Sequence, residues 1–272
     1  SGALARSALD GFADAGGCSA ADALAAYLEA LRELPRMAPP LHRWRGHAEV
    51  HVAQRRELRT IGIVTTVASP RRFTVRVVGE SGHSGEVAMD ARHDALAAAA
   101  EVVLAVETAA RAQPAQTVAT VGTIAIAPGA LSVIPGEARL GIDVRGISAA
   151  SLQAFEADLR TAVDELARRR GVTAALEPTR RGNPVAMDRE LVQLALAAAR
   201  RAGIAATETW SGAGHDAQHL AALVPSLLLF VPLHGGESHT PGESASMDEI
   251  VQAARIAAEV LAARVLDSEP EL

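Results

Sequence analysis

Apolar residues recur at helical spacing in several stretches of the chain. Between residues 94 and 111, Leu96, Ala99 and Val103 fall on one face of such a helix. A repeat of three to four residues predicts an amphipathic helix that packs one side against a core. The same pattern predicts helices at 19–34, 148–169 and 189–202, a shorter helix after Gly214 and a last helix after Ser246.

Other stretches show the patterns of β-strands. Phe73, Val75 and Val77 alternate with polar residues, which predicts a strand with one buried face. Residues 61–64 and 227–231 are apolar throughout, as in strands that are covered on both faces. Further strands are predicted at 117–126, 138–144, 173–176 and 207–210.

The order of these elements predicts an α/β fold in two parts. Between residues 68 and 181 the order is βαββαβ, which is typical of a ferredoxin-like α+β module. The chain before and after this stretch has the rhythm of a second α/β unit. We therefore expect one domain made of residues 1–67 and 182–272, interrupted by a domain made of residues 68–181.

Composition narrows the classes of function. The chain has 272 residues, of which 49% are hydrophobic and 3% aromatic, so a packed core of aliphatic side chains is expected and a disordered protein is excluded. No apolar stretch is long enough to cross a membrane. All 26 basic residues are Arg, and the absence of Lys excludes Schiff-base chemistry and a P-loop. The formal net charge of −6 argues against a nucleic-acid partner.

The cysteine content and the first residues bear on location and completeness. Cys18 is the only cysteine, so an internal disulfide is excluded and a reducing compartment such as the cytoplasm is expected. The chain starts at Ser1 without a methionine or a signal segment. We therefore expect that its start was trimmed or that it is part of something longer.

Histidines cluster in two regions of the chain. Of the nine, five lie between His42 and His93 and four between His215 and His239. Histidine titrates near neutral pH and binds metals, so the clusters mark candidate site segments. Chance accumulation in polar loops is the alternative. Three loops rich in small residues, 79–85, 211–216 and 235–241, each hold a histidine beside a predicted strand or helix, which favours a site.

Six segments, in order along the chain, carry a resemblance to a known family. They are His51-Val-Ala-Gln54, Gly82-His-Ser-Gly85, Pro128 to Gly136, Asp143-Val-Arg145, Ser211 to Asp216, and Ser238-His-Thr-Pro241. Together they resemble the M20-type metal-dependent amidohydrolases of the hydantoinase/carbamoylase branch, which includes N-carbamoyl-L-amino acid hydrolases, β-ureidopropionase-like enzymes and allantoate amidohydrolases. The resemblance implies a partial M20-like catalytic α/β domain with an inserted lid and dimerisation domain.

The resemblance also implies roles for individual residues. His51 and His239 would each hold one of two divalent metal ions, zinc or manganese. His83 would reach the site of the other subunit in a homodimer formed through the lid and stabilise an oxyanion. Arg145 would bind the substrate carboxylate. The polar positions expected around the substrate are Gln54, Ser132, His215 and Asp216.

The chain departs from the family pattern in ways that affect activity. Ala53, Arg55 and Ser132 stand where the family usually has Glu, Gly and Asn. The family's H-x-D and Glu-Glu segments, which supply most metal ligands and the general base, do not occur in this sequence. We expect a hydrolase of linear amide-type C–N bonds that carries only part of its site and is inactive alone, completed by a missing N-terminal segment or chain. The alternative is a non-catalytic dimeric binding or regulatory relative. A serine hydrolase is set aside because no G-x-S-x-G segment is present.

Overall fold

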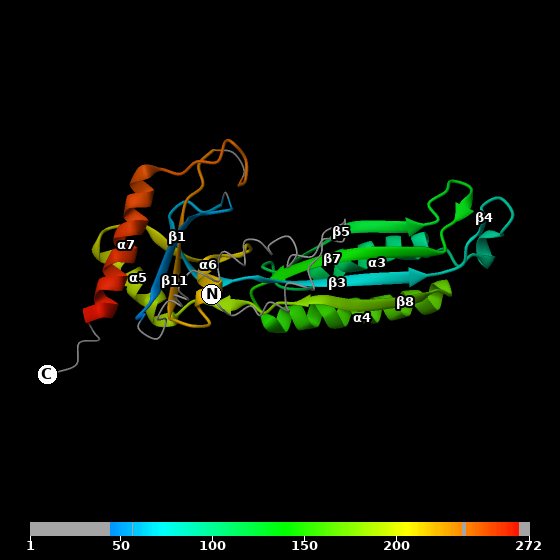
Figure 1. Ribbon diagram of the computed structural model, residues 1–272, viewed down its shortest axis with the longest axis horizontal. Helices are drawn as coiled ribbons and strands as arrows, with labels where there is room; N and C mark the ends of the chain where they lie inside the picture. The colour runs from blue at the N-terminus through cyan, green and yellow to red at the C-terminus, as the bar shows by residue number, and fades with distance from the viewer. Residues whose placement is uncertain (1–43, 56, 236–237, 267–272) are drawn as a thin grey trace, which may run out of the picture. The chain divides into compact units, whose positions relative to one another are not determined.

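The computed structural model describes residues 44–55, 57–235 and 238–266 (Figure 1). The helix predicted at 19–34 and the single cysteine lie outside these residues. Within the described part of the chain, no helix is long and apolar enough to cross a membrane. The residues from Arg45 onward form one compact unit, and this unit contains two large β-sheets, each with its own helices and its own hydrophobic core, and a small two-stranded sheet.

The first sheet is mixed and has the order β1-β11-β2-β10, with the short β9 also paired to β2. The pairs β1/β11 and β10/β2 are parallel, whereas β11/β2 and β2/β9 are antiparallel. All six side chains of β11 are buried, as the apolar run in the sequence predicts. The strands are β1 (His47–Val52), β2 (Ile61–Val67), β9 (Val185–Ala186), β10 (Ala206–Ser211) and β11 (Ser226–Val231).

Three helices belong to the first sheet: α5 (Arg189–Arg201), α6 (Asp216–Leu220) and α7 (Met247–Leu266). Helices α5 and α7 contact each other and the sheet (Figure 1). Helix α5 begins where the Asp188 carboxylate accepts a hydrogen bond from Leu191 N at 2.9 Å. Its apolar stripe packs with Ile256 of α7 and the strands into one core.

The second sheet is antiparallel, with the order β5-β7-β3-β8. Helices α3 and α4 pack against each other and against this sheet, and Phe73, Phe155 and Leu159 are among the residues that fill the core between them (Figure 1). The α/β prediction and the βαββαβ order are confirmed. The elements are β3 (Ser69–Val78), α3 (Ala95–Arg111), β5 (Val118–Ala127), β7 (Glu137–Gly146), α4 (Ala149–Arg170) and β8 (Thr173–Arg181).

Two small features near the second sheet were not predicted. The strands β4 (Gly82–His83) and β6 (Val133–Ile134) pair with each other in a two-stranded sheet of their own, and a turn of 3-10 helix, η3, spans Met89–Ala91. Helix α3 then begins at Asp94, whose carboxylate accepts hydrogen bonds from Leu96 N and Ala97 N.

The chain passes from the first large sheet to the second and back again at one place. Strand β3 starts at Ser69, directly after β2, and β8 ends at Arg181, shortly before β9. Between the crossings, Gly182 N donates to Pro70 O at 3.2 Å, and the buried Arg71 donates to Gly182 O and to Asn183. A Cβ at Gly182 would lie 2.5 Å from Pro70 O, so this approach of the two crossings requires glycine.

Candidate functional site

Several of the predicted site residues meet at the ends of β1 and β10. His51 lies near the end of β1, opposite Phe230 of β11, and its Nδ1 is 2.7 Å from Val52 O. Because a carbonyl oxygen can only accept, Nδ1 carries the proton and donates. The lone pair of Nε2 is therefore available to bind a metal ion, as in histidines that ligate metals through this nitrogen.

A group of three polar side chains, Glu49, His215 and Ser211, adjoins His51 and is called the relay below; His215 and Ser211 are buried and Glu49 is partly buried. The Nε2 atom of His215 is 2.8 Å from Ser211 Oγ, and its Nδ1 is 3.5 Å from Glu49 Oε1, too far for a good hydrogen bond. Glu49 Oε2 accepts a hydrogen bond from Ala217 N at 2.6 Å. The Ser211 hydroxyl donates its single proton to Ala213 O at 3.0 Å, so Nε2 of His215 carries a proton and donates to Ser211 Oγ.

The relay contacts His51 through the ring of His215. The rings of His215 and His51 meet edge to face, with centroids 4.8 Å apart. Burial lowers the pKa of His215 below its ordinary value, the charge of His51 lowers it further, and the Glu49 carboxylate opposes both without cancelling them. His215 is 6% exposed and both of its nitrogens face protein groups. The predicted contact between His215 and substrate stays a prediction, and the structure adds a packing role.

Ser211 also shapes the turn that follows β10. Its Oγ accepts a hydrogen bond from Ala213 N at 3.1 Å, which holds the turn beside the relay. The carbonyl of Gly212 in this turn accepts a hydrogen bond from Arg145 Nη1 at 3.2 Å. The turn therefore connects the relay in the first sheet to an arginine at the end of β7 in the second sheet.

Arg145 is fixed in place but not enclosed. Its Nε donates to Asp143 Oδ1 at 2.9 Å, and its side chain is 38% exposed. Burial alone would raise the pKa of Asp143, but the hydrogen bonds and charges of Arg145 and Arg72 outweigh it and hold that pKa below its usual value. Within the described residues Nη2 of Arg145 has no hydrogen-bond partner. The guanidinium can therefore bind an anion from solvent without first breaking a contact.

Gln54 and His239 come together from distant parts of the chain. Gln54 Nε2 lies 3.5 Å from His239 Nε2. His239 has a positive φ of 65°, and its N–H donates to Glu243 Oε2 at 2.6 Å, which fixes this unusual backbone conformation. Asp216 is the exposed first residue of α6. Gln54 and His239 thus meet across 185 residues of sequence, and their roles toward substrate and metal stay predictions.

His83 lies in β4, and Ser132 directly precedes β6, the strand that pairs with β4. Ser84 N donates to Ser132 O at 3.0 Å, and Gly85 N donates to His83 Nδ1 at 3.0 Å. Because Nδ1 accepts this hydrogen bond, Nε2 carries the proton of the neutral ring and is exposed as a donor. No contact joins His83 or Ser132 to His51 in the described part of this chain.

The described residues do not by themselves fit a two-metal centre. His51 has the tautomer of a ligand, but no group of three or more His, Cys, Asp or Glu side chains that could hold a metal ion occurs among residues 44–55, 57–235 and 238–266. Two imidazoles supply no negative charge to balance two divalent cations. The donor set available here is therefore incomplete.

Sequence reasoning identified Arg55 only as a departure and missed its contacts. Its Nη2 donates to Thr209 Oγ1 at 3.0 Å and to Trp210 O at 3.2 Å, and its guanidinium lies 4.2 Å from the centre of the Trp210 ring. The roles of Glu49 and Ser211 were also missed. Glu49 lies two residues before His51 in a strand, so the alternation of β1 was a signal that both point to one side.

The fold and the sequence agree on the class of protein. The crystal structure of a hydantoinase/carbamoylase family amidase from Burkholderia ambifaria superimposes with a TM-score of 0.80 and 30% sequence identity, covering 97% of this chain and 63% of that chain. A structure from the same family in Burkholderia phymatum gives a TM-score of 0.79 and 32% identity over 96% of this chain and 64% of that chain. The two-sheet α/β fold is that of these amidases.

Comparison of sequences identifies the family. The model of peptidase family M20/M25/M40 matches residues 16–263, and the chain belongs to this family. Allantoate amidohydrolase of Bacillus subtilis is 34% identical over 74% of this chain and 50% of that protein. N-carbamoyl-L-amino-acid amidohydrolase of a Pseudomonas species is 36% identical over 72% of this chain and 48% of that protein. The chain spans about half the length of the curated relatives it matches.

Proposed function

We propose that the chain is part of an amidohydrolase that cleaves a linear amide-type C–N bond in N-carbamoyl amino acids or related ureido compounds. The observation that carries this proposal is Arg145, which is anchored by Asp143 and Gly212 and keeps one guanidinium nitrogen for an anion. The relatives are named for allantoate and N-carbamoyl-L-amino acids, and these substrates carry a carboxylate. A planar guanidinium is suited to binding such a group.

The other residues take the roles that the family pattern implies. Arg145 binds the carboxylate, and Gln54, Ser132, His215 and Asp216 provide the polar surroundings. The exposed Nε2–H of His83 donates to the developing oxyanion in the site of a second subunit. In the complete site two divalent metal ions, zinc or manganese, would supply the activated water. His51 and His239 are each expected to provide one ligand, and the remaining donors come from outside the described residues.

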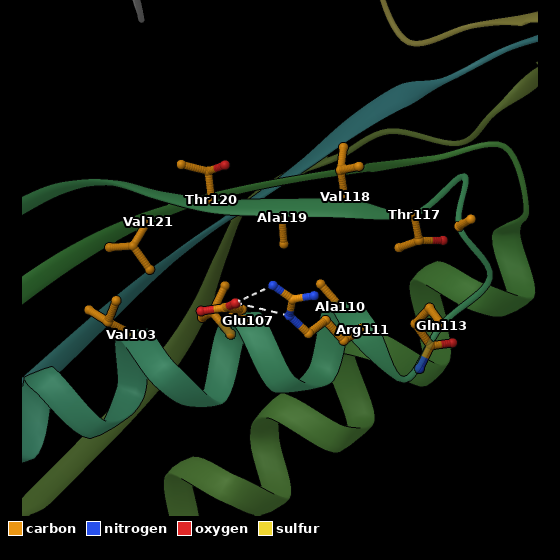
Figure 2. Close-up of a pocket in the computed structure, with 12 residues that line it drawn as sticks. Val103, Glu107, Ala110, Arg111, Gln113, Thr117, Val118, Ala119, Thr120 and Val121 are labelled. Atoms are coloured by element: carbon orange, nitrogen blue, oxygen red, sulfur yellow. Dashed lines mark hydrogen bonds and ion pairs between the residues drawn. The ribbon is translucent and has the colours of Figure 1, made fainter.

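We further propose that residues 68–181 form a lid and dimerisation domain, and that residues 1–67 and 182–272 belong to the catalytic domain. Strand β5 is the edge of the second sheet, and its exposed apolar side chains include Ile124 and Ile126. Between β5 and α3 lies a groove of about 780 Å³, toward which Val103, Ala119 and Val121 point (Figure 2). An exposed apolar edge strand is a template for pairing with a second copy.

Binding of an N-carbamoyl amino acid tests the substrate class. The full chain is titrated with N-carbamoyl-L-alanine by calorimetry, alongside the Arg145→Gln variant. Loss of a charge-assisted contact of about 1.5–3 kcal/mol lowers the affinity roughly 10- to 100-fold. Arg139→Gln, on the same strand but paired with Glu137, is the matched control and keeps wild-type affinity. If the wild type does not bind, or if Arg145→Gln binds equally well, the proposal fails.

Light scattering tests the dimer. Ile124 is 50% exposed on the edge strand, so Ile124→Glu is expected to convert a dimer into a monomer at micromolar concentration. Met247 is 70% exposed at the start of α7, and Met247→Glu serves as the control that stays dimeric. A monomeric wild type would contradict dimerisation through this edge.

A non-catalytic binding or regulatory protein is the second candidate. Ala53 is 1% exposed beside His51, so no carboxylate lies at the position where the family pattern has Glu. Metal analysis and an assay on carbamoyl amino acids separate the two proposals. Two bound metal ions together with hydrolysis of carbamoyl amino acids would reject the non-catalytic proposal. We also propose a cytoplasmic location, since the single cysteine allows no internal disulfide.

A further inference from the structure

Arg55 is a fixed cation without a carboxylate partner. Its Nη2 donates to Thr209 Oγ1 and Trp210 O, and the indole ring of Trp210 lies under the guanidinium at 4.2 Å. Within the described residues, no carboxylate lies within ion-pair distance of Arg55, and its Nε and Nη1 atoms make no hydrogen bond. The guanidinium is therefore held in one orientation while two of its nitrogens face outward.

The position of Arg55 relates it to Arg145. Arg55 lines a small cleft of about 20 Å³ together with Gln54 and Gly212. Its own hydrogen bond is to the carbonyl of Trp210, and that of Arg145 is to the carbonyl of Gly212. Two residues of extended chain span about 7 Å, so the two guanidinium groups bind carbonyls of one short segment.

A structural role alone explains only part of this arrangement. The hydrogen bonds to Thr209 and Trp210 fasten the loop after β1 to β10, and a neutral glutamine could do the same. A guanidinium that is stacked on an indole and left without an acidic neighbour in the described residues has, in addition, the properties of an anion receptor. Its partly hydrated setting makes the attraction moderate and dependent on salt.

We propose that Arg55 binds a second negatively charged group of the substrate, and that the preferred substrates are ureido acids with an acidic side chain. One carboxylate would bind Arg145, and the side-chain carboxylate would bind the outward nitrogens of Arg55, each with N–O distances of about 2.8 Å. A short dicarboxylate of the N-carbamoyl aspartate or glutamate type can bridge two cations that bind one short segment. This inference rests on the proposed function.

The test compares two ligands that differ in one charge. The full chain is titrated by calorimetry at low ionic strength with N-carbamoyl-L-aspartate and with its neutral isostere N-carbamoyl-L-asparagine. We expect the wild type to prefer the aspartate compound by about tenfold, as for one charge-assisted contact at a hydrated site. Arg55→Gln removes this preference, and added salt reduces it in the wild type.

Arg59→Gln is the matched control. Arg59 is an exposed arginine that follows in the same loop and makes no hydrogen bond or ion pair with the described residues, so its loss leaves the preference at the wild-type value. Urea unfolding followed by tryptophan fluorescence confirms that each variant is folded. If asparagine and aspartate compounds bind the wild type equally, or if Arg55→Gln keeps the preference, the inference is wrong and the proposed function stands. If neither compound binds the wild type, both fail.

Discussion

Removal of one hydroxyl from the relay should destabilise the first sheet. Ser211 is 3% exposed, and its Oγ pairs with His215 Nε2 at 2.8 Å, with Ala213 N at 3.1 Å and with Ala213 O at 3.0 Å. Ser211→Ala removes the partner of all three groups in a site too buried for water to replace the hydroxyl readily. A buried polar group that loses its partner costs about 1–3 kcal/mol, and a less buried N–H costs less.

The expected loss for Ser211→Ala is therefore about 2–4 kcal/mol in the free energy of unfolding. Ser226 offers a matched comparison, because it is 1% exposed but its hydroxyl makes a single hydrogen bond, to Val224 O at 3.0 Å. Ser226→Ala should lower the free energy of unfolding by only about 1 kcal/mol. It removes one hydrogen bond to a carbonyl oxygen, whereas Ser211→Ala removes several at once.

Urea unfolding measures both variants. Trp210 precedes Ser211 in β10 and reports on this sheet through its fluorescence, whereas Trp44 is already 39% exposed. The midpoint for Ser211→Ala should fall further than that for Ser226→Ala, with an unchanged slope. Equal midpoints for the two variants would show that the relay is not a connected network, and the reasoning about Ser211 and His215 would be refuted.

Three further predictions concern the second sheet. Phe155→Ala removes a fully buried ring of α4 and should lower the free energy of unfolding by about 3–5 kcal/mol, whereas Leu104→Ala, at a side chain 62% exposed, should change it by less than about 0.5 kcal/mol in chemical denaturation. Asp94→Ala removes the carboxylate that caps α3 and should cost about 1 kcal/mol; an unchanged denaturation midpoint would contradict the capping role. Hydrogen bonds from Arg76 and then Arg139 lower the pKa of Glu137 from 4.5 to about 2, so this carboxylate stabilises the fold above pH 4.5 and loses that effect as the pH falls through about 2. The carboxyl ¹³C shift of Glu137 should titrate near pH 2 and move to higher pH in Arg76→Gln, and a midpoint near 4.5 in the wild type would disprove the pairing.

The long helices and the buried strands were predictable because their signals are local. In α4 the residues from Leu152 to Leu166 repeat at helical spacing, and all of these inward side chains are buried. Strand β11 was predictable because an uninterrupted apolar run must be covered on both faces. Strands β4 and β6 have two residues each, and they exist only because two distant segments pair, so no local pattern marks them.

The candidate site was predictable only where a residue carries its own chemistry. His51, His239 and Arg145 were assigned roles because the segments that hold them resemble the family motifs, and those roles stay predictions. The relay could not be predicted in this way. Its residue Glu49 accepts a hydrogen bond from Ala217 N, 168 residues away in sequence, and the two meet only when the first sheet is assembled. Arg55 was visible as an exception to the family pattern, but its stacking on Trp210 depends on how β10 lies beside β2.

Because the chain enters and leaves the second sheet at one place, this sheet is a continuous segment inserted into the chain of the first sheet. The chain leaves through Pro70 and returns through Gly182, and these two residues are joined by a hydrogen bond of 3.2 Å. An excised segment from 69 to 181 would thus have adjacent ends, and a short turn could close the gap left in the remaining chain. Such an arrangement allows the module to be exchanged between relatives without re-threading the first sheet.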